Sequence, residues 1–301
     1  MSMRRSSQPW LKTSNPMCAY NLYIPRPANL SGKAIFLSAS VPSKERSKQY
    51  RRIDNAATSI EEAVLAVTRA VFSAGGKLVF GAHPSISPLV ASVIGEYFAP
   101  EITSLEKRDQ SKSEESELRT HVLMYQSLAW EKQWEERSRE LAEYPQVHLE
   151  WIEAVPGEKV DPAKLSDRQV PKSMEQMSRR MISDTMPAAM VTIGGMEGVE
   201  EEVKLFMELC PGKPVFVFST TGGAAAIIAE RRIDHKSDIL VVDEKALDDV
   251  KKFWTSPESN DSRSLDGQKI REGSAHADFR ESRYYVPYSV LAQQIVKKIA
   301  G

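Results

Sequence analysis

Short apolar segments alternate along this chain with longer amphipathic segments, and this alternation limits the fold more than any other feature of the sequence. A short, continuously apolar segment is typical of a strand buried on both faces, and each amphipathic segment predicts a helix. The order predicts β-α-β units with right-handed crossovers, and hence an α/β fold with a Rossmann-like, doubly wound, mostly parallel sheet. The strands are expected at 33–38, 77–80, 121–125, 147–152, 188–193, 213–218 and 238–242.

Two of these strands differ from the others. Residues 147–152 alternate with period two, as an edge strand does, and 238–242 form either a strand or a short buried segment. One helix is expected to begin at Ser59, because Ser59 and Glu62 have the spacing of a capping box. The other helices are expected at 84–98, 129–143, 172–186, 199–209, 224–230 and 287–299.

The domain organisation follows from where apolar residues are scarce. Residues 1–31 are polar and contain several prolines, and we expect them to form an N-terminal arm. Residues 32–301 are expected to form a single domain. Within it, residues 255–283 have little apolar content and predict a polar insertion that is mobile and dispensable for folding.

Charge and composition argue against several classes of function. The chain has 40 Lys and Arg residues against 41 Asp and Glu, so nucleic acid is not an expected partner. The chain has two cysteines, Cys18 and Cys210, so we expect no disulfide framework. No residues have metal-ligand spacing, and we expect no metal and no cofactor. No apolar run reaches membrane-helix length and no secretory signal is present, which predicts a cytoplasmic protein with no membrane partner.

Small and hydroxyl-bearing residues cluster directly after four of the predicted strands. Because the carboxyl ends of parallel strands lie at one edge of a sheet, these four turns are expected to meet there. Glycine lets the backbone approach a ligand closely, and free amides at helix N-termini favour phosphate. The expected partner is therefore a small-molecule nucleotide. The candidate nucleotide-binding residues are Ser38, Ser40, Gly81, His83, Gly194, Gly195, Gly198, Thr220, Thr221, Gly222 and Gly223.

Three common glycine motifs are missing from these turns. The chain has no GxGxxG after its first predicted strand, no GxxxxGK[ST] and no GxSxG. Their absence argues against three functions: dehydrogenase, P-loop NTPase and α/β-hydrolase.

Three segments carry a resemblance to a known group of proteins. Residues 75–86, the Arg179-Arg180 pair within 177–181, and residues 189–202 resemble the SLOG superfamily. That superfamily includes the cytokinin-activating LOG phosphoribohydrolases, the DNA-processing Smf proteins and nucleotide-sensing domains of bacterial conflict systems. The resemblance extends over roughly 33–230 and implies a Rossmann-like fold with a nucleotide or a nucleotide derivative as ligand.

The chain departs from the LOG pattern, which has Arg-Lys on a helix and then Pro-Gly-Gly-x-Gly-Thr-x-x-Glu. Ile193 stands in place of the proline, Val199 stands in place of the threonine, and one residue is added between Gly195 and Gly198. These changes make the chain more similar to prokaryotic SLOG subfamilies associated with signalling or conflict than to LOG enzymes.

The resemblance also implies catalytic residues, if LOG-type chemistry is retained. Glu202, or Glu201 beside it, would stabilise an oxocarbenium ion or activate water during N-glycosidic cleavage. Arg179 or Arg180 would hold a phosphate or the reacting ribose. The alternative is that these glutamates are only a solvated first helical turn that complements the helix dipole.

The first hypothesis is therefore a module that senses or sequesters a nucleotide or an NAD-derived molecule. The alternatives are a LOG-like nucleoside 5′-monophosphate phosphoribohydrolase and a nucleoside deoxyribosyltransferase-like enzyme. A Smf-like nucleic-acid protein is disfavoured by the balanced charge. We expect a homodimer or higher homo-oligomer. A pure binding module would also require a separately encoded effector.

Overall fold

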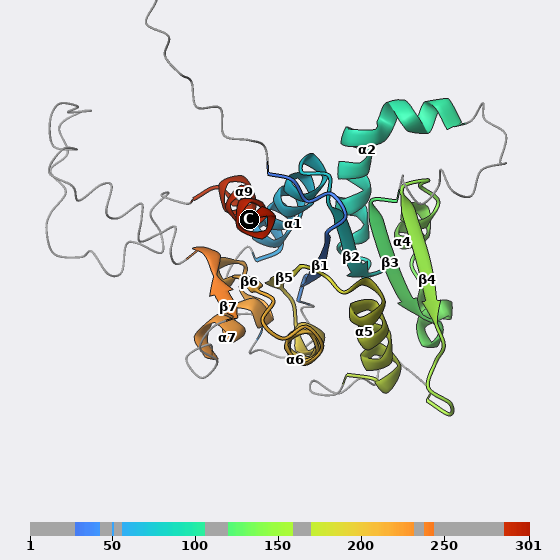
Figure 1. Ribbon diagram of the computed structural model, residues 1–301. Helices are drawn as coiled ribbons and strands as arrows, with labels where there is room; N and C mark the ends of the chain where they lie inside the picture. Colours follow the sequence, from blue (N-terminus) through green and yellow to red (C-terminus); the bar gives the residue numbers. More distant parts are fainter. Residues whose placement is uncertain are drawn as a thin grey trace, which may run out of the picture.

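The computed structural model describes residues 28–42, 50, 56–105, 120–158, 170–231, 238–243 and 286–301. Within these ranges the chain forms one seven-stranded sheet in the order β4-β3-β2-β1-β5-β6-β7, and all the paired strands are parallel (Figure 1). The predicted α/β, Rossmann-like, doubly wound fold is thereby confirmed. The strands are β1 (Ala34–Ser40), β2 (Lys77–Gly81), β3 (Val122–Ser127), β4 (Val147–Ile152), β5 (Ala189–Gly194), β6 (Val215–Phe218) and β7 (Ile239–Val241).

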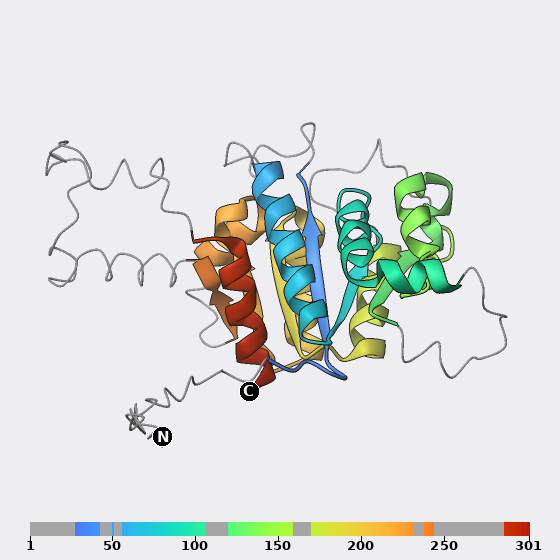
Figure 2. The same ribbon diagram turned by 90° about the horizontal axis from the view of Figure 1, so that it is seen from above.

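Helices cover both faces of the sheet in two layers. One layer contains α9, α1, α2 and α4 side by side, and the other contains α5, α6 and α7 (Figures 1 and 2). Short 3-10 helices, η2 and η4, follow β3 and β6. The helices and 3-10 helices are α1 (Ala56–Ser73), α2 (Ser87–Leu105), η2 (Leu128–Gln133), α4 (Glu136–Ala142), α5 (Lys172–Thr185), α6 (Glu197–Leu209), η4 (Ser219–Thr221), α7 (Gly223–Arg231) and α9 (Tyr288–Ala300).

The two layers bury separate cores because successive side chains of a strand point to opposite faces of the sheet. In β1, Ile35 and Leu37 pack into the core beneath α1 and α9. Phe36 points to the other face, where its ring lies 6.4 Å from that of Phe206 on α6. Every residue of β5 is buried, which explains why the central strands have continuously apolar sequences.

Three expectations about helices differ from the structure. The helix expected at 84–98 spans Ser87–Leu105 as α2. Ser59 is not the N-cap of its helix, because α1 already includes Ala56. The helix expected at 129–143 is divided into η2 and α4. The side chain of Ser127 accepts a hydrogen bond from the amide of Ala129 at 3.3 Å and begins the 3-10 turn. The backbone of Trp134 is then extended, and its ring packs edge-on against Trp151 of β4.

Only the end of the predicted N-terminal arm, residues 28–31, is described. Leu30 in this stretch is fully buried, and its amide donates to the carbonyl oxygen of Ala74 at 2.7 Å. The predicted insertion at 255–283 lies outside the described residues. Among the helices that the structure describes, none has both the length and the apolar character needed to span a membrane.

Candidate functional site

The carboxyl ends of four adjacent strands bring the four small-residue turns together. These strands, β2, β1, β5 and β6, are neighbours in the sheet, and Ser40 at the end of β1 lies opposite Gly194 at the end of β5. Along the chain, strands are added on one side of β1 up to β4 and on its other side from β5 onward. The position between β1 and β5 is thus the topological switch point, where open α/β sheets bind their ligands.

The turn after β5 is tight and depends on two glycines. Gly194 and Gly195 have positive φ angles of 58° and 84°, and the amide of Gly195 donates to the carbonyl oxygen of Ser40 at 2.8 Å. A Cβ on Gly194 would lie 2.4 Å from Cδ1 of Ile60, and one on Gly195 would lie 2.2 Å from Cγ2 of Val199. Internal packing therefore demands both glycines.

Carboxyl groups gather on the first turns of α6. Glu202 accepts a hydrogen bond at one carboxyl oxygen from the hydroxyl of Ser38, two residues before the end of β1. Its other oxygen accepts from the hydroxyl of Ser178 on α5 at 3.0 Å. Burial raises the pKa of the Glu202 carboxyl, and the two hydroxyl groups oppose this shift only in part. A carboxyl group that keeps its proton to higher pH is suited to proton transfer.

A second glutamate on α6 is also held in place. Glu200 accepts hydrogen bonds from the hydroxyl of Tyr50 at 2.6 Å and from Arg231 at 2.7 Å. Tyr50 is buried, and sequence reasoning missed it because it lies in a polar stretch with no motif. Oε1 of Glu197, at the start of the same helix, is buried without a hydrogen-bond partner among the described residues. The α6 dipole favours this group of negative charges.

The two arginines of the expected catalytic set do not lie beside Glu202. Arg179 pairs with Glu208 at 3.0 Å, and Arg180 pairs with Asp184 at 3.1 Å. The preceding residue, Ser178, is the α5 residue that hydrogen-bonds to Glu202. Glu201 pairs with Lys204 on the surface of α6. Of the four candidate catalytic residues, only Glu202 is therefore hydrogen-bonded beneath the switch point.

The turn after β6 is closed by groups of the protein itself. The amide of Thr220 donates to Asp243 at 2.6 Å, and the hydroxyl of Ser219 donates to the same carboxylate at 2.9 Å. The hydroxyl of Thr220 lies 3.0 Å from that of Tyr288, whose pKa burial raises to about 12. Asp243 is almost fully buried, and its carboxylate already accepts from two donors of this turn.

The remaining residues of the turn after β6 hold it to the turn after β5. The hydroxyl of Thr221 accepts from the amide of Gly194 at 2.8 Å and donates to the carbonyl oxygen of Phe218 at 2.6 Å. Gly222 and Gly223 have positive φ angles of 71° and 60°. The Thr220–Gly223 turn thus uses most of its donors within the protein. Sequence reasoning missed Asp243, although an acidic residue directly after an apolar strand was a visible signal.

The turn after β2 contributes His83. Its Nδ1 accepts a hydrogen bond from the amide of Ser85 at 3.2 Å, so Nε2 carries the proton of the neutral ring. The hydroxyl of Ser85 accepts from the amide of Val41, just past β1, at 3.2 Å. A Cβ on Gly81 would meet Cε of Met177 at 3.2 Å. His83 is therefore held beside the β1 exit.

Gly198 differs from the other glycines of this edge. It is exposed on the first turn of α6, and a Cβ there would meet nothing within 4 Å. No group of three or more His, Cys, Asp or Glu side chains within the described ranges is arranged to hold a metal ion.

One of three comparisons with known proteins, the match to a family model, agrees with the resemblance seen in the sequence. A search of curated proteins finds no significant match. Among solved structures, the X-ray structure of TM1055, a structural genomics target, aligns with 16% identity and a TM-score of 0.39, covering 73% of this chain and 99% of that one. The model of the SLOG cluster3 family matches residues 49–247, which is more than half of the chain. This protein belongs to the SLOG cluster3 family.

Proposed function

We propose that the protein binds a nucleotide or an NAD-derived small molecule at the carboxyl edge of the sheet, between the exits of β1 and β5, as a sensing or sequestering module. The observation that carries this proposal is Glu202, a carboxyl group held by Ser38 and Ser178 beneath the switch point. Membership of the SLOG cluster3 family supports a nucleotide-related ligand.

Different parts of such a ligand would meet different groups. Carboxylates accept hydrogen bonds from ribose hydroxyls, as an acidic residue does in dinucleotide-binding Rossmann folds. Glu202 and Glu200 are suited to that role. The exposed first turn of α6 at Gly198 offers backbone amides and the positive end of the helix dipole to a phosphate. The β6 turn is a weaker phosphate site, because Asp243 already accepts from the Thr220 amide.

The surface ion pairs of Arg179 and Arg180 favour binding over catalysis. The resemblance to LOG enzymes implies an arginine on a phosphate or on the reacting ribose, and both arginines pair instead with carboxylates of α5 and α6. A module of this kind passes its signal to a separately encoded effector or through a homo-oligomer, and both remain proposals.

A second candidate function is N-glycosidic cleavage of a nucleotide. It is favoured by one observation, the burial that raises the pKa of Glu202 beneath the switch point. A carboxyl group of this kind serves either as a general acid or, once ionised, as a stabiliser of an oxocarbenium ion.

Gly198→Leu tests the proposed site. The new side chain would project into open space on the first turn of α6, so it should block ligand approach without disturbing the core. Gly95→Leu is the matched control, since Gly95 lies within α2 and a Cβ there also meets nothing within 4 Å. Leucine improves helix propensity at both positions.

Calorimetric titrations with AMP, ADP-ribose and NAD supply the measurement. At least one of these ligands should bind the wild type, and Gly198→Leu should weaken that binding by about tenfold or more, the equivalent of one lost good contact. Gly95→Leu should match the wild type. Wild-type affinity in Gly198→Leu, or no binding of any of the three by the wild type, would refute the proposal.

A further inference from the structure

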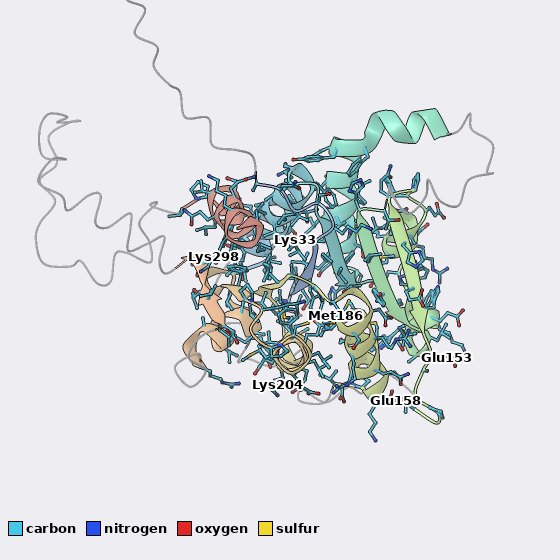
Figure 3. The ribbon with its side chains drawn as sticks, in the orientation of Figure 1. Lys33, Glu153, Glu158, Met186, Lys204 and Lys298 are labelled. Atoms are coloured by element: carbon cyan, nitrogen blue, oxygen red, sulfur yellow. The ribbon has the colours of Figure 1, made fainter. Side chains whose placement is uncertain are left out.

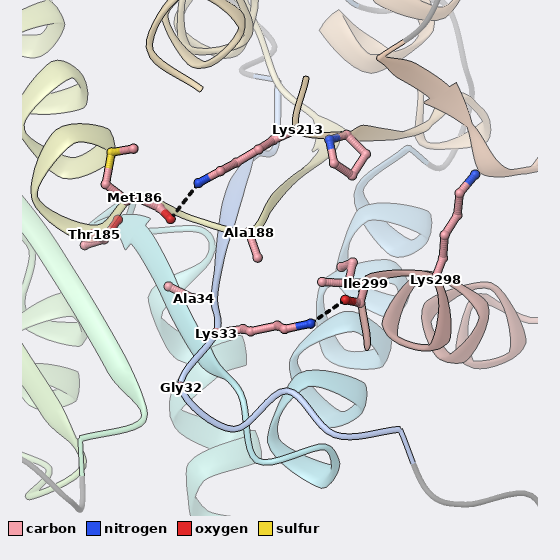
Figure 4. Close-up of a pocket in the computed structure, with 10 residues that line it drawn as sticks. Gly32, Lys33, Ala34, Thr185, Met186, Ala188, Lys213, Lys298 and Ile299 are labelled. Atoms are coloured by element: carbon pink, nitrogen blue, oxygen red, sulfur yellow. Dashed lines mark hydrogen bonds between the residues drawn. The ribbon is translucent and has the colours of Figure 1, made fainter. Parts of the chain in front are cut away.

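A cavity of about 460 Å³ lies at the opposite, amino-terminal edge of the sheet (Figure 4). It is formed where β1 begins, where α5 and α9 end, and just before β6. Its volume is within the range of small-molecule pockets in proteins. Three lysines line it, Lys33, Lys213 and Lys298, and its lining contains no aspartate or glutamate. We call this cavity the lysine pocket.

The lysines keep part of their capacity to bind an anion. Lys33 donates to the carbonyl oxygens of Ile299 at 2.7 Å and of Ala300 at 3.4 Å, while Lys213 donates to that of Met186 at 2.9 Å. An ammonium group has three donors, so neither lysine is saturated. Lys298 forms no ion pair or hydrogen bond with any residue that the structure describes.

The balance of charge in the lysine pocket is positive. The carbonyl ends of α5 and α9 contribute a partial negative charge of about half a unit each. Three full positive charges exceed these two partial ones, and no carboxylate of the lining offsets them. The pocket therefore attracts anions, and several anionic groups more strongly than one.

Met186 adds an apolar wall. It ends α5 in the left-handed conformation, with φ of 42°, and is the only non-glycine residue with positive φ within the described part of the chain. The residue is 54% exposed. Figure 3 labels Lys33, Lys298 and Met186, which come from the start of β1 and from the ends of α9 and α5. Met186 belongs to the same lining as the three lysines, and its exposed thioether offers a contact for the apolar part of a ligand.

We propose that the lysine pocket is a second ligand site, which binds a small polyanion carrying adjacent phosphate or carboxylate groups. The anionic groups lie against Lys33, Lys213 and Lys298, and any apolar body of the ligand packs on Met186. This proposal does not depend on the function proposed for the carboxyl edge, which lies at the other end of the strands.

Lys298→Glu tests the proposal, because Lys298 makes no contact that the fold requires. Lys297→Glu is its matched control: Lys297 is the exposed neighbour on α9, it does not line the cavity, and its replacement changes net charge equally. The probe is inorganic pyrophosphate, titrated by calorimetry at moderate ionic strength. We expect saturable binding to the wild type, a loss of about tenfold or more in Lys298→Glu, and little change in Lys297→Glu.

A local readout keeps the test decisive if Lys298→Glu does not fold. In wild-type protein labelled at the methionine methyl groups, pyrophosphate should shift the Met186 resonance, because Met186 lines the pocket and its carbonyl oxygen accepts from Lys213. Met186→Leu assigns that resonance. Absence of saturable binding, equal losses in both lysine variants, or an unmoved Met186 resonance at saturation would each overturn the proposal. Binding that Gly198→Leu abolishes and Lys298→Glu leaves intact would assign pyrophosphate to the carboxyl edge and would also overturn it.

Discussion

Gly223 lies directly against the carbonyl group of Gly195. The amide of Ala224, the next residue, donates to that oxygen at 2.9 Å, and a Cβ on Gly223 would lie 2.5 Å from it. The turns after β5 and β6 are thus packed backbone against backbone. Glycine-rich turns at the carboxyl edge predict a ligand site from sequence, yet at Gly223 the packing of two turns already explains the glycine.

Gly223→Ala should be strongly destabilising. The added methyl group would clash with backbone atoms that cannot move away, and the residue has a positive φ of 60°. Gly212→Ala is the matched control, since Gly212 has a φ of 77° but open space around its Cβ position. We expect a loss of about 1–2 kcal/mol for Gly212→Ala from the backbone conformation alone, and at least about 2 kcal/mol more for Gly223→Ala. Urea unfolding measures both. Equal losses would contradict the tight contact between the turns.

Glu202→Gln should stabilise the protein near neutral pH. Burial raises the pKa of this carboxyl above the ordinary value of 4.5, so the folded protein retains the proton to higher pH than the unfolded chain does. The contribution of Glu202 to stability is therefore present below the unfolded pKa and is lost as pH rises through the folded pKa. Glutamine removes this dependence and can still hydrogen-bond to Ser38 and Ser178.

Denaturant unfolding near neutral pH and at pH 4.5 checks this expectation. The gain from Glu202→Gln should be larger near neutral pH and should shrink as pH falls toward 4.5. Glu201→Gln is the control, because Glu201 forms an exposed pair with Lys204 and such pairs contribute little. A gain that does not depend on pH would show that the Glu202 carboxyl is not desolvated in the folded protein.

Met186→Gly should also stabilise the protein. A left-handed residue after a helix is usually glycine, and a side chain there costs about 1–2 kcal/mol, part of which the greater freedom of glycine in the unfolded chain offsets. We expect Met186→Gly to exceed Met186→Ala by about 0.5–1 kcal/mol in the free energy of unfolding, since alanine removes the side chain but keeps the strain. Identical values for the two variants would argue against the left-handed conformation.

The sheet could be predicted from the sequence because its central strands are buried on both faces and end in small residues. The contacts of the site could not, because they depend on helix rotation and on distant segments. One residue along a helix turns a side chain by about 100°, and this separates Ser178, which contacts Glu202, from Arg179, which lies on the surface. Asp243 reaches Ser219 from the end of another strand, so its place after an apolar segment was visible in the sequence but its partner was not.

The choice between a binding module and an N-glycosidase depends on turnover. We expect little or no free base from nucleoside monophosphates or NAD, because Arg179 and Arg180 pair with other carboxylates and Val199 packs against Gly195 where LOG enzymes have a hydroxyl. Chromatography of the reaction products measures base release.

If the protein is an enzyme, Glu202→Gln should lower turnover by about 10²–10³-fold while ligand affinity changes far less, since the lost charge acts mainly in the transition state. Glu201→Gln, on the same helix, should then retain activity. Base release that disappears in Glu202→Gln and persists in Glu201→Gln would establish the enzyme, and no release from the wild type would leave binding as the function of this edge.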